Sequence, residues 1–148
     1  KLDSLWSARE VLRGYFDDEF DTLVCNIDLA NDTDFDDMSG EKWRREVIAE
    51  IDGLFYTIRA LRPFMNRNGG SIIIAAAKDE NSGFASKIME SYIEGLTRSL
   101  SESMRSVGIH VNAIIYRNSD YAGSHVFEAV RQFASSDSSF ITGQIIRL

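Results

Sequence analysis

Two short runs in this chain are apolar almost throughout, and they constrain the fold more than any other feature. Residues 71–77 read SIIIAAA and residues 109–115 read IHVNAII. A strand that is apolar on both of its faces is typical of a parallel sheet covered by helices on both sides. Segments with the helical spacing of apolar residues lie between these runs. The sequence therefore predicts an α/β fold.

The expected elements alternate along the chain, which we interpret as one domain over residues 1–148. Helices are expected at 4–16, 41–68, 86–107 and 124–136, and strands at 21–30, 71–77, 109–115 and 143–148. Pro63 should tighten the last turns of the second helix, and the glycine pair at 69–70 should end it. If the strands lie in chain order, right-handed connections place the three linking helices mostly on one face of the sheet.

The first strand raises a packing problem. With the strands in chain order, residues 21–30 form an edge strand of very apolar character. An apolar edge strand offers unpaired N–H and C=O groups to other chains. Something should therefore complete this sheet.

Composition excludes several classes of function. The net charge is −7 and the pI is about 4.8, which disfavours nucleic acid and anionic membranes, because both attract clustered Lys and Arg. No apolar run is long enough to span a membrane. The single Cys25 cannot form an internal disulfide and favours a reducing, intracellular compartment. The chain begins at Lys1, so a mitochondrion or plastid is the alternative if a transit peptide has been removed.

Four stretches together resemble the short-chain dehydrogenase/reductase family over nearly the whole chain. They are DTLVCNIDLA, the long helix with SIIIAAA, GLTRSLSESMRSVGIHVNAI, and FASSDSSFITGQIIRL. The resemblance, to proteins similar to 3-ketoacyl-ACP reductase, implies a three-layer Rossmann-like parallel sheet. It also implies an incomplete sheet of four strands, because the family's N-terminal nucleotide-binding βαβ half and its glycine-rich phosphate turn have no counterpart in this sequence. We therefore expect no cofactor.

The positions that carry catalysis in the family hold other residues here. The family's Tyr-x-x-x-Lys pair falls on Ser86 and Glu90. A serine hydroxyl is a much weaker acid than a phenol, and a carboxylate raises the pKa of a neighbouring acid instead of lowering it. The family's catalytic serine falls on Ala77, which has no hydroxyl. The resemblance thus implies a chain whose catalytic positions have lost their chemistry.

Further positions of the family's active site also differ. Its helix asparagine falls on Glu50, and its Asn-Asn-Ala-Gly strand end reads CNID at residues 25–28. Only Asn26 is kept, and Asp28 puts a negative charge where the cofactor would pass. The family's Pro-Gly is replaced by YR at residues 116–117. We interpret Asn26 and Asp28 as remnants of a cofactor site.

Other clusters have ordinary interpretations. The aspartates between residues 32 and 37 begin like a calcium loop, but Asp37 occupies the glycine position and Trp43 the position of the closing glutamate. We expect a solvated loop that caps the following helix. His110 and His125 have no clear partner in the sequence for a zinc site or a catalytic triad. No metal site is expected.

The long helix is apolar around most of its circumference, so it needs partners on more than one side. The resemblance implies that this helix and the next one pack against their counterparts in a second subunit. Gly53 and Gly95 would allow such helices to approach closely. The interface candidates are Trp43, Phe55, Tyr56, Phe64, Tyr92 and Leu96.

Three functions follow, in order of preference. The first is a non-catalytic structural or assembly subunit that binds itself, an active paralogue or a larger complex. The second is an NAD(P)-dependent, ketoreductase-like oxidoreductase fragment whose cofactor-binding half lies upstream or in a partner. The third is a small-ligand binding module at the carboxyl ends of the strands, where open parallel sheets bind ligands.

Overall fold

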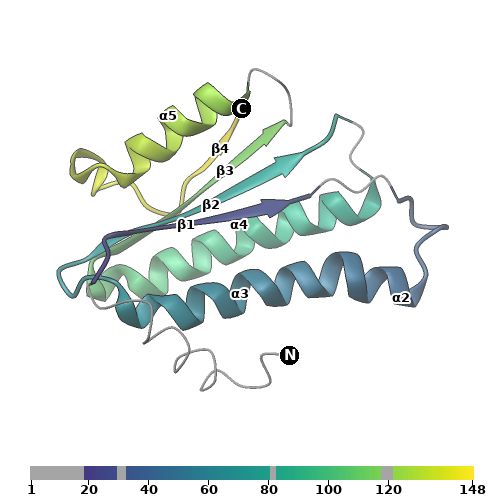
Figure 1. Ribbon diagram of the computed structural model, residues 1–148, viewed down its shortest axis with the longest axis horizontal. Coiled ribbons are helices and arrows are strands. Elements are labelled where there is room, and N and C mark those ends of the chain that lie inside the picture. The colour runs from purple at the N-terminus through teal and green to yellow at the C-terminus, as the bar shows by residue number, and fades with distance from the viewer. Residues whose placement is uncertain (1–18, 30–32, 81–82, 118–121) are drawn as a thin grey trace.

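A computed structural model describes residues 19–29, 33–80, 83–117 and 122–148 of the chain. Its sheet has four parallel strands in chain order: β1 (Thr22–Asp28), β2 (Gly70–Lys78), β3 (Ile109–Arg117) and β4 (Ile145–Arg147). Helices cover both faces of this sheet (Figure 1). The α/β prediction is therefore confirmed, and the helix expected at residues 4–16 lies outside the described residues.

The two central strands explain why the sheet lies in the middle of the molecule. Every residue from Ser71 to Ala77 of β2 is buried, and β3 has the same character from Val111 to Ile115. Successive side chains of a strand point to opposite faces. Ile72 of β2 accordingly belongs to the larger core cluster, whereas Ile73 belongs to a smaller one on the other face.

The helical segment before β2 begins where the sequence predicts and ends earlier. It runs through α2 (Gly40–Trp43), a π-helical turn (Arg44–Ile48) and α3 (Ala49–Leu61). The Ser39 hydroxyl caps its start by accepting a hydrogen bond from the Lys42 N–H, at 3.2 Å.

The expected helix end at residue 68 is wrong. Pro63 has no N–H for a helical hydrogen bond, so α3 stops at Leu61 and a 3₁₀ turn, Arg62–Phe64, follows. Gly70 is already the first residue of β2. The expectation that Pro63 tightens the last turns is thus confirmed, but the glycine pair does not end the helix.

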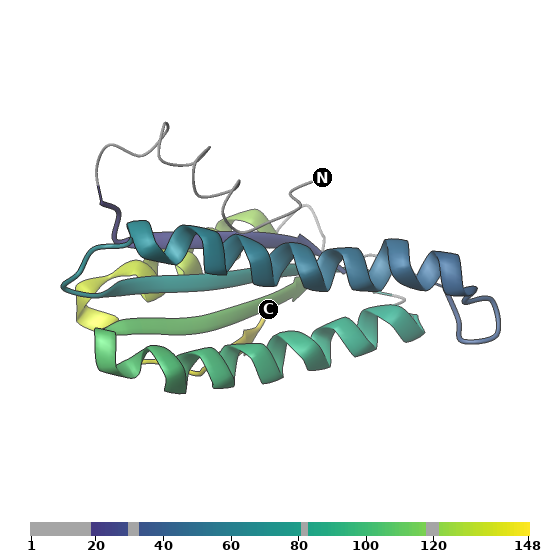
Figure 2. The same ribbon diagram turned by 90° about the horizontal axis from the view of Figure 1, so that it is seen from below.

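The helix α4 (Phe84–Met104) lies beside α3 on the same face of the sheet (Figure 2). Its apolar stripe, which includes Ala85, Met89 and Ile93, is buried in the larger core cluster. A 3₁₀ turn follows, and Gly108 ends the segment in the left-handed conformation, with φ of 71°. That conformation favours glycine.

The third linking helix, α5 (Ala122–Ala134), crosses the opposite face of the sheet (Figure 1). Its Phe133 packs against Ile73 and Ile114, and the Ser71 hydroxyl donates to the Phe133 carbonyl at 2.9 Å. Two of the three linking helices therefore share a face, and the third does not. Because the strand order continues in the same direction, the β3–β4 connection has the opposite hand to the two before it. The reason is that β2 and β3 are apolar on both faces, so the second face also needs a cover.

A buried amide holds this unusual connection in place. Asn112 of β3 is 1% exposed. Its Nδ2 donates to the Ile141 carbonyl and its Oδ1 accepts from the Gln144 N–H, both at 3.0 Å. Together with the hydrogen bonds of Val111 to Thr142 and Gly143, this side chain fixes the segment that leads into the short strand β4.

The strand β1 lies at the edge of the sheet, as the strand order requires. Among the described residues, no strand pairs with its outer side. Its side chains alternate between buried and exposed, and Val24 is 45% exposed on the face opposite α3. The need for a further partner at this edge stays a prediction.

Candidate functional site

The carboxyl ends of three strands meet in register at one edge of the sheet. Asp28 of β1 lies beside Ala77 of β2, and Ala77 lies beside Tyr116 of β3. The Tyr116 hydroxyl donates to the Asn26 side-chain oxygen at 3.3 Å. The structure thus brings together Asn26, Asp28 and Ala77, three of the positions that the sequence singled out.

Ser86, at the family's tyrosine position, lies in the first turns of α4 and is fully buried. Within the described ranges, its hydroxyl has no hydrogen-bond partner. A proton donor must come within hydrogen-bond reach of the group it protonates. A hydroxyl closed off from solvent does not meet that condition in this conformation.

Glu90, one turn further along α4, is held by two cations from different strands. Its Oε2 lies 3.1 Å from Lys78 Nζ at the end of β2, and its Oε1 lies 3.2 Å from Arg147 Nε of β4. Partial burial acts to raise the pKa of Glu90, but the hydrogen bonds and charges of Lys78 and then Arg147 hold it below its ordinary value. The carboxylate therefore stays ionised at neutral pH and is a poor proton donor or base there.

The network continues along α4 and ties the last strand to this helix. Arg147 also forms an ion pair with Glu94. The Oε2 atom of Glu94 in turn lies 3.6 Å from Nη2 of Arg98. We name Lys78, Glu90, Glu94 and Arg147 the carboxylate cluster. It joins β2, α4 and β4 through charge-assisted contacts, the stronger class of hydrogen bond. Sequence reasoning missed Lys78 and Arg147, although both are cations at the carboxyl ends of strands.

Glu50 is not part of this cluster. It is exposed on α3 and lines a pocket of about 250 Å³ beside the edge strand, together with Asn26 and Gly53. Among the residues that the structure describes, those bounding the pocket belong to β1 and α3. Glu50 therefore faces the region where an additional part of the fold would adjoin β1.

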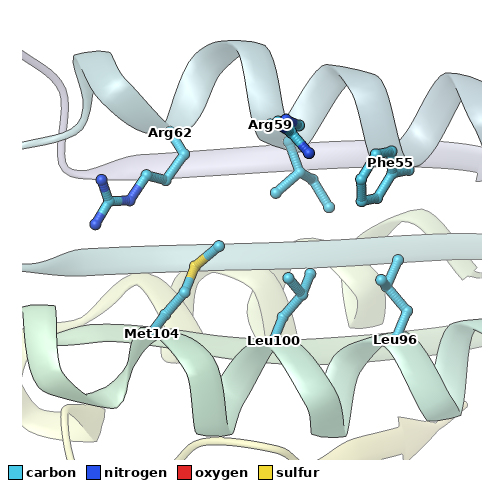
Figure 3. Close-up of a pocket in the computed structure, with 7 residues that line it drawn as sticks. Phe55, Arg59, Arg62, Leu96, Leu100 and Met104 are labelled. Atoms are coloured by element: carbon cyan, nitrogen blue, oxygen red, sulfur yellow. The ribbon is translucent and has the colours of Figure 1, made fainter.

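A second concave surface lies between α3 and α4 on the outer side of the helix layer. It has a volume of about 270 Å³ and is mostly apolar; we name it the α3–α4 groove, lined by Phe55, Ile58, Arg59, Arg62, Leu96, Leu100 and Met104. Figure 3 shows side chains of the two helices pointing toward one another across it. The Arg59 guanidinium lies over the Phe55 ring, 5.9 Å from its centroid.

The six interface candidates lie in different environments. Phe55 and Leu96 line the groove, and the 51% exposed Tyr56 packs its ring edge-on against Phe55, with centroids 5.4 Å apart. Trp43 and Tyr92 are half-buried against the larger core cluster. The remaining candidate, Phe64, is half-buried in the 3₁₀ turn.

The spacing of Leu96, Leu100 and Met104 also marks the groove, because every fourth residue returns to the same side of a helix. Only Leu96 of the three is among the predicted interface residues. That these helices form an interface with a second subunit stays a prediction.

The described residues contain no group of three or more His, Cys, Asp or Glu side chains that could hold a metal ion. Within the same ranges, no helix is both long and apolar enough to cross a membrane. Cys25 is buried, and that burial raises the pKa of its thiol to about 11.

Comparison with known proteins decides the family. The profile of the enoyl-(acyl carrier protein) reductase family matches residues 5–118. This chain belongs to the short-chain dehydrogenase/reductase family. An uncharacterised oxidoreductase of Schizosaccharomyces pombe is 31% identical over 97 residues, which are 62% of this chain and 38% of the relative. A trans-4-hydroxycyclohexanecarboxylate dehydrogenase of Sinomonas cyclohexanicum is 24% identical over 146 residues, covering 83% of this chain and 56% of the relative.

Solved structures show that this short-chain dehydrogenase/reductase has the family's fold. Acetoin dehydrogenase from Enterobacter cloacae has a TM-score of 0.80 at 22% identity, covering 96% of this chain and 67% of that structure. A 3-oxoacyl-[acyl-carrier protein] reductase with bound NAD from Brucella melitensis also has a TM-score of 0.80 at 22% identity, over 98% of this chain and 66% of that structure. The predicted family and incomplete fold are confirmed, and the chain spans about half or less of the curated relatives.

Proposed function

We propose that this short-chain dehydrogenase/reductase is a non-catalytic subunit that acts by association through the α3–α4 groove. The observation that carries the proposal is the state of the two positions aligned with the family's Tyr-x-x-x-Lys pair. Ser86 is buried in the core, and its hydroxyl finds no hydrogen-bond partner among the described residues. Glu90 is engaged by Lys78 and Arg147. Both positions serve the packing of α4 against the sheet, and neither offers an acid to a substrate.

The groove supplies the other half of the proposal. Two helices place five apolar side chains around one depression, with the guanidinium groups of Arg59 and Arg62 on its α3 side. Apolar side chains flanked by arginine are characteristic of protein–protein interfaces. The partner is a second copy of this chain or a paralogue, each of which would present helices to this face.

Sedimentation equilibrium of the wild type and of Leu100→Arg tests the association. A guanidinium at the centre of the groove would be buried without a partner, which costs several kcal/mol in an interface (roughly 2–5). We expect the wild type to exceed its chain mass of 16.7 kDa and Leu100→Arg to lose that association while keeping its circular dichroism spectrum. Phe140→Arg, at an 83% exposed position outside the groove, is the matched control. An assembly unaffected by Leu100→Arg would refute the assigned face.

A second candidate function is a fragment of an NAD(P)-dependent oxidoreductase. In the described part of the chain, no strand pairs with the outer side of β1, and a pocket lies beside that strand. Both features favour this alternative, because a cofactor-binding half would adjoin the sheet there. The discriminating experiment is NADPH binding by the longest natural form of the protein. Saturable binding with ketone reduction that Glu90→Gln abolishes would replace our proposal with this one.

A further inference from the structure

A third pocket lies at the amino-terminal edge of the sheet. It has a volume of about 320 Å³, at the lower end of the range of small-molecule sites. The pocket is lined by Arg105, Ile109, His110, Ser139, Phe140 and Thr142. The end of α4 and the yellow segment before β4 lie at the same end of the molecule, opposite the arrowheads of the strands (Figure 1, Figure 2). The pocket shares no lining residue with the α3–α4 groove and is remote from the carboxylate cluster.

The shortness of β4 explains why a hollow forms here. β4 pairs with β3 only from Ala113 onward, so in the described part of the chain no strand lies beside the first residues of β3 on that side. The segment before β4 takes this place. The Val111 N–H donates to the Thr142 hydroxyl oxygen at 3.0 Å, and the Gly143 N–H donates to the Val111 carbonyl at 2.7 Å. These bonds to a buried strand hold one wall of the pocket in a defined position.

The polar side chains of this pocket are suited to donating hydrogen bonds. Among the residues described, none that lines the pocket is an Asp or Glu, and Arg105 takes part in no ion pair with another described residue. The Thr142 oxygen already accepts from the backbone, which leaves its O–H to donate. Ser139 and His110 add a second hydroxyl and an imidazole. In a chain of net charge −7, a pocket with a guanidinium and these donors is suited to an anion.

The backbone beside Arg105 bears on the same question. The carbonyl groups at the end of a helix carry partial negative charge, which disfavours an anion. The Arg105 carbonyl, however, accepts from the Gly108 N–H at 3.1 Å, and the Gly108 carbonyl accepts from the Gly70 N–H at 3.2 Å. Both carbonyls are therefore engaged within the fold.

We propose that this pocket binds a small phosphate monoester that carries an apolar ring. The planar guanidinium of Arg105 matches two phosphate oxygens, and the hydroxyls of Ser139 and Thr142 supply donors for the others. A carboxylate has two oxygens and would use fewer of these donors. Phe140, whose side chain is 83% exposed, offers an aromatic surface to the ring of the ligand. This binding site is independent of association through the α3–α4 groove.

Calorimetric titration with phenyl phosphate tests the site. We expect saturable binding by the wild type at low salt with a Kd of about 1 mM or lower, and weaker binding of inorganic phosphate and of benzoate. Arg105→Gln should raise the Kd for phenyl phosphate about fivefold or more, because it removes the charged donor. Arg45→Gln is the matched control, since it removes the same charge at an exposed position outside the pocket. Its Kd should change by about twofold or less.

A second variant separates the ring from the phosphate. Phe140→Ala should raise the Kd for phenyl phosphate about threefold, because the aromatic contact is lost. The same variant should leave the Kd for inorganic phosphate within about twofold of the wild-type value. Because Phe140 is exposed, its truncation should leave the fold intact.

Nuclear magnetic resonance of the wild type locates the site without any variant. On addition of phenyl phosphate, the backbone amide signals of Ser139 and Thr142 should shift. The signal of Leu100 should not shift, although the groove that it lines also contains arginines.

The outcomes decide each part of the inference. An absence of saturable phenyl phosphate binding, an Arg105→Gln protein that binds as tightly as the wild type, or shifts confined to the groove would overturn the site. Tighter binding of benzoate than of phenyl phosphate would overturn the assignment to phosphate. A Phe140→Ala protein with unchanged affinity for phenyl phosphate would overturn the role of the ring. None of these measurements depends on self-association, so this inference and the proposed function can fail separately.

Discussion

Replacing Glu90 with glutamine removes a charge from the carboxylate cluster and keeps the side-chain shape. Glu90 is 17% exposed and Lys78 is 23% exposed, so solvent screens this pair less than a surface pair. A hydrogen bond to a charged group contributes about 1.5–3 kcal/mol, and an exposed ion pair about 0.2–1 kcal/mol. Arg147 keeps Glu94 as a partner, so the loss falls mainly on Lys78. We expect the free energy of unfolding at neutral pH to fall by about 1–2 kcal/mol.

The effect has a defined dependence on pH. Burial opposes the shift, yet Lys78 and then Arg147 hold the pKa of Glu90 below its ordinary value of 4.5. A carboxylate with a depressed pKa in the folded state contributes stability that is present above the unfolded-state pKa and is lost as the pH falls through the folded-state pKa. The stability difference between wild type and Glu90→Gln should therefore stay constant from neutral pH to about pH 5 and shrink progressively below about pH 4.5.

Urea denaturation followed by circular dichroism at several pH values measures this difference. With an m-value of about 1–3 kcal/mol/M, the expected loss lowers the urea midpoint by roughly 0.5–1 M at neutral pH. Glu102→Gln is the matched control, because Glu102 is exposed on the same helix and forms no ion pair among the described residues. The Glu102→Gln substitution should change the free energy of unfolding by no more than about 0.5 kcal/mol. A Glu90→Gln protein as stable as the wild type, or a difference that persists at about pH 3, would show that Lys78 and Arg147 do not stabilise the fold through the ionised form of Glu90.

Three further outcomes follow from other parts of the fold. Asn112→Ala should lower the free energy of unfolding by about 2–3 kcal/mol, because the Ile141 carbonyl and the Gln144 N–H both lose their buried partner. Urea denaturation measures this loss, and a loss under about 0.5 kcal/mol would contradict the prediction. Gly53→Ala and Gly95→Ala should each raise the stability measured by thermal melts by about 0.5–1 kcal/mol, because a Cβ at either position meets nothing within 4 Å. A loss of stability in either variant would show that the space around that glycine is not open. The Cys25 thiol, with its pKa raised by burial to about 11, should react with a disulfide reagent at least tenfold or so more slowly in the native protein than in urea, and equal rates would contradict its burial.

The sheet could be predicted from the sequence because its signal is local. The runs at β2 and β3 are apolar on both faces, which few arrangements other than a covered parallel sheet accommodate. The side taken by α5 could not be predicted in the same way. Both faces of the central strands are apolar, so only the packing of Phe133 against Ile73 and Ile114 selects the face.

Part of the candidate site could likewise be predicted from the sequence, and part could not. The positions of Ser86, Glu90 and Ala77 follow from their spacing within recognisable stretches. The partners of Glu90 do not, because Lys78 lies 12 residues before it and Arg147 lies 57 residues after it. Such contacts form only when parallel strands bring their carboxyl ends to a common edge. The long-range part of the carboxylate cluster therefore needed the structure.

We propose that Glu90, held by Lys78 and Arg147 at a catalytic position of the family, leaves this chain without the proton donor that carbonyl reduction needs. Titration of the purified chain into NADPH, with fluorescence and ketone reduction followed in the same samples, tests it most directly. We expect neither saturable binding nor turnover above the protein-free rate. Saturable binding together with turnover that disappears in Glu90→Gln but persists in Glu102→Gln would show that the chain is an active reductase.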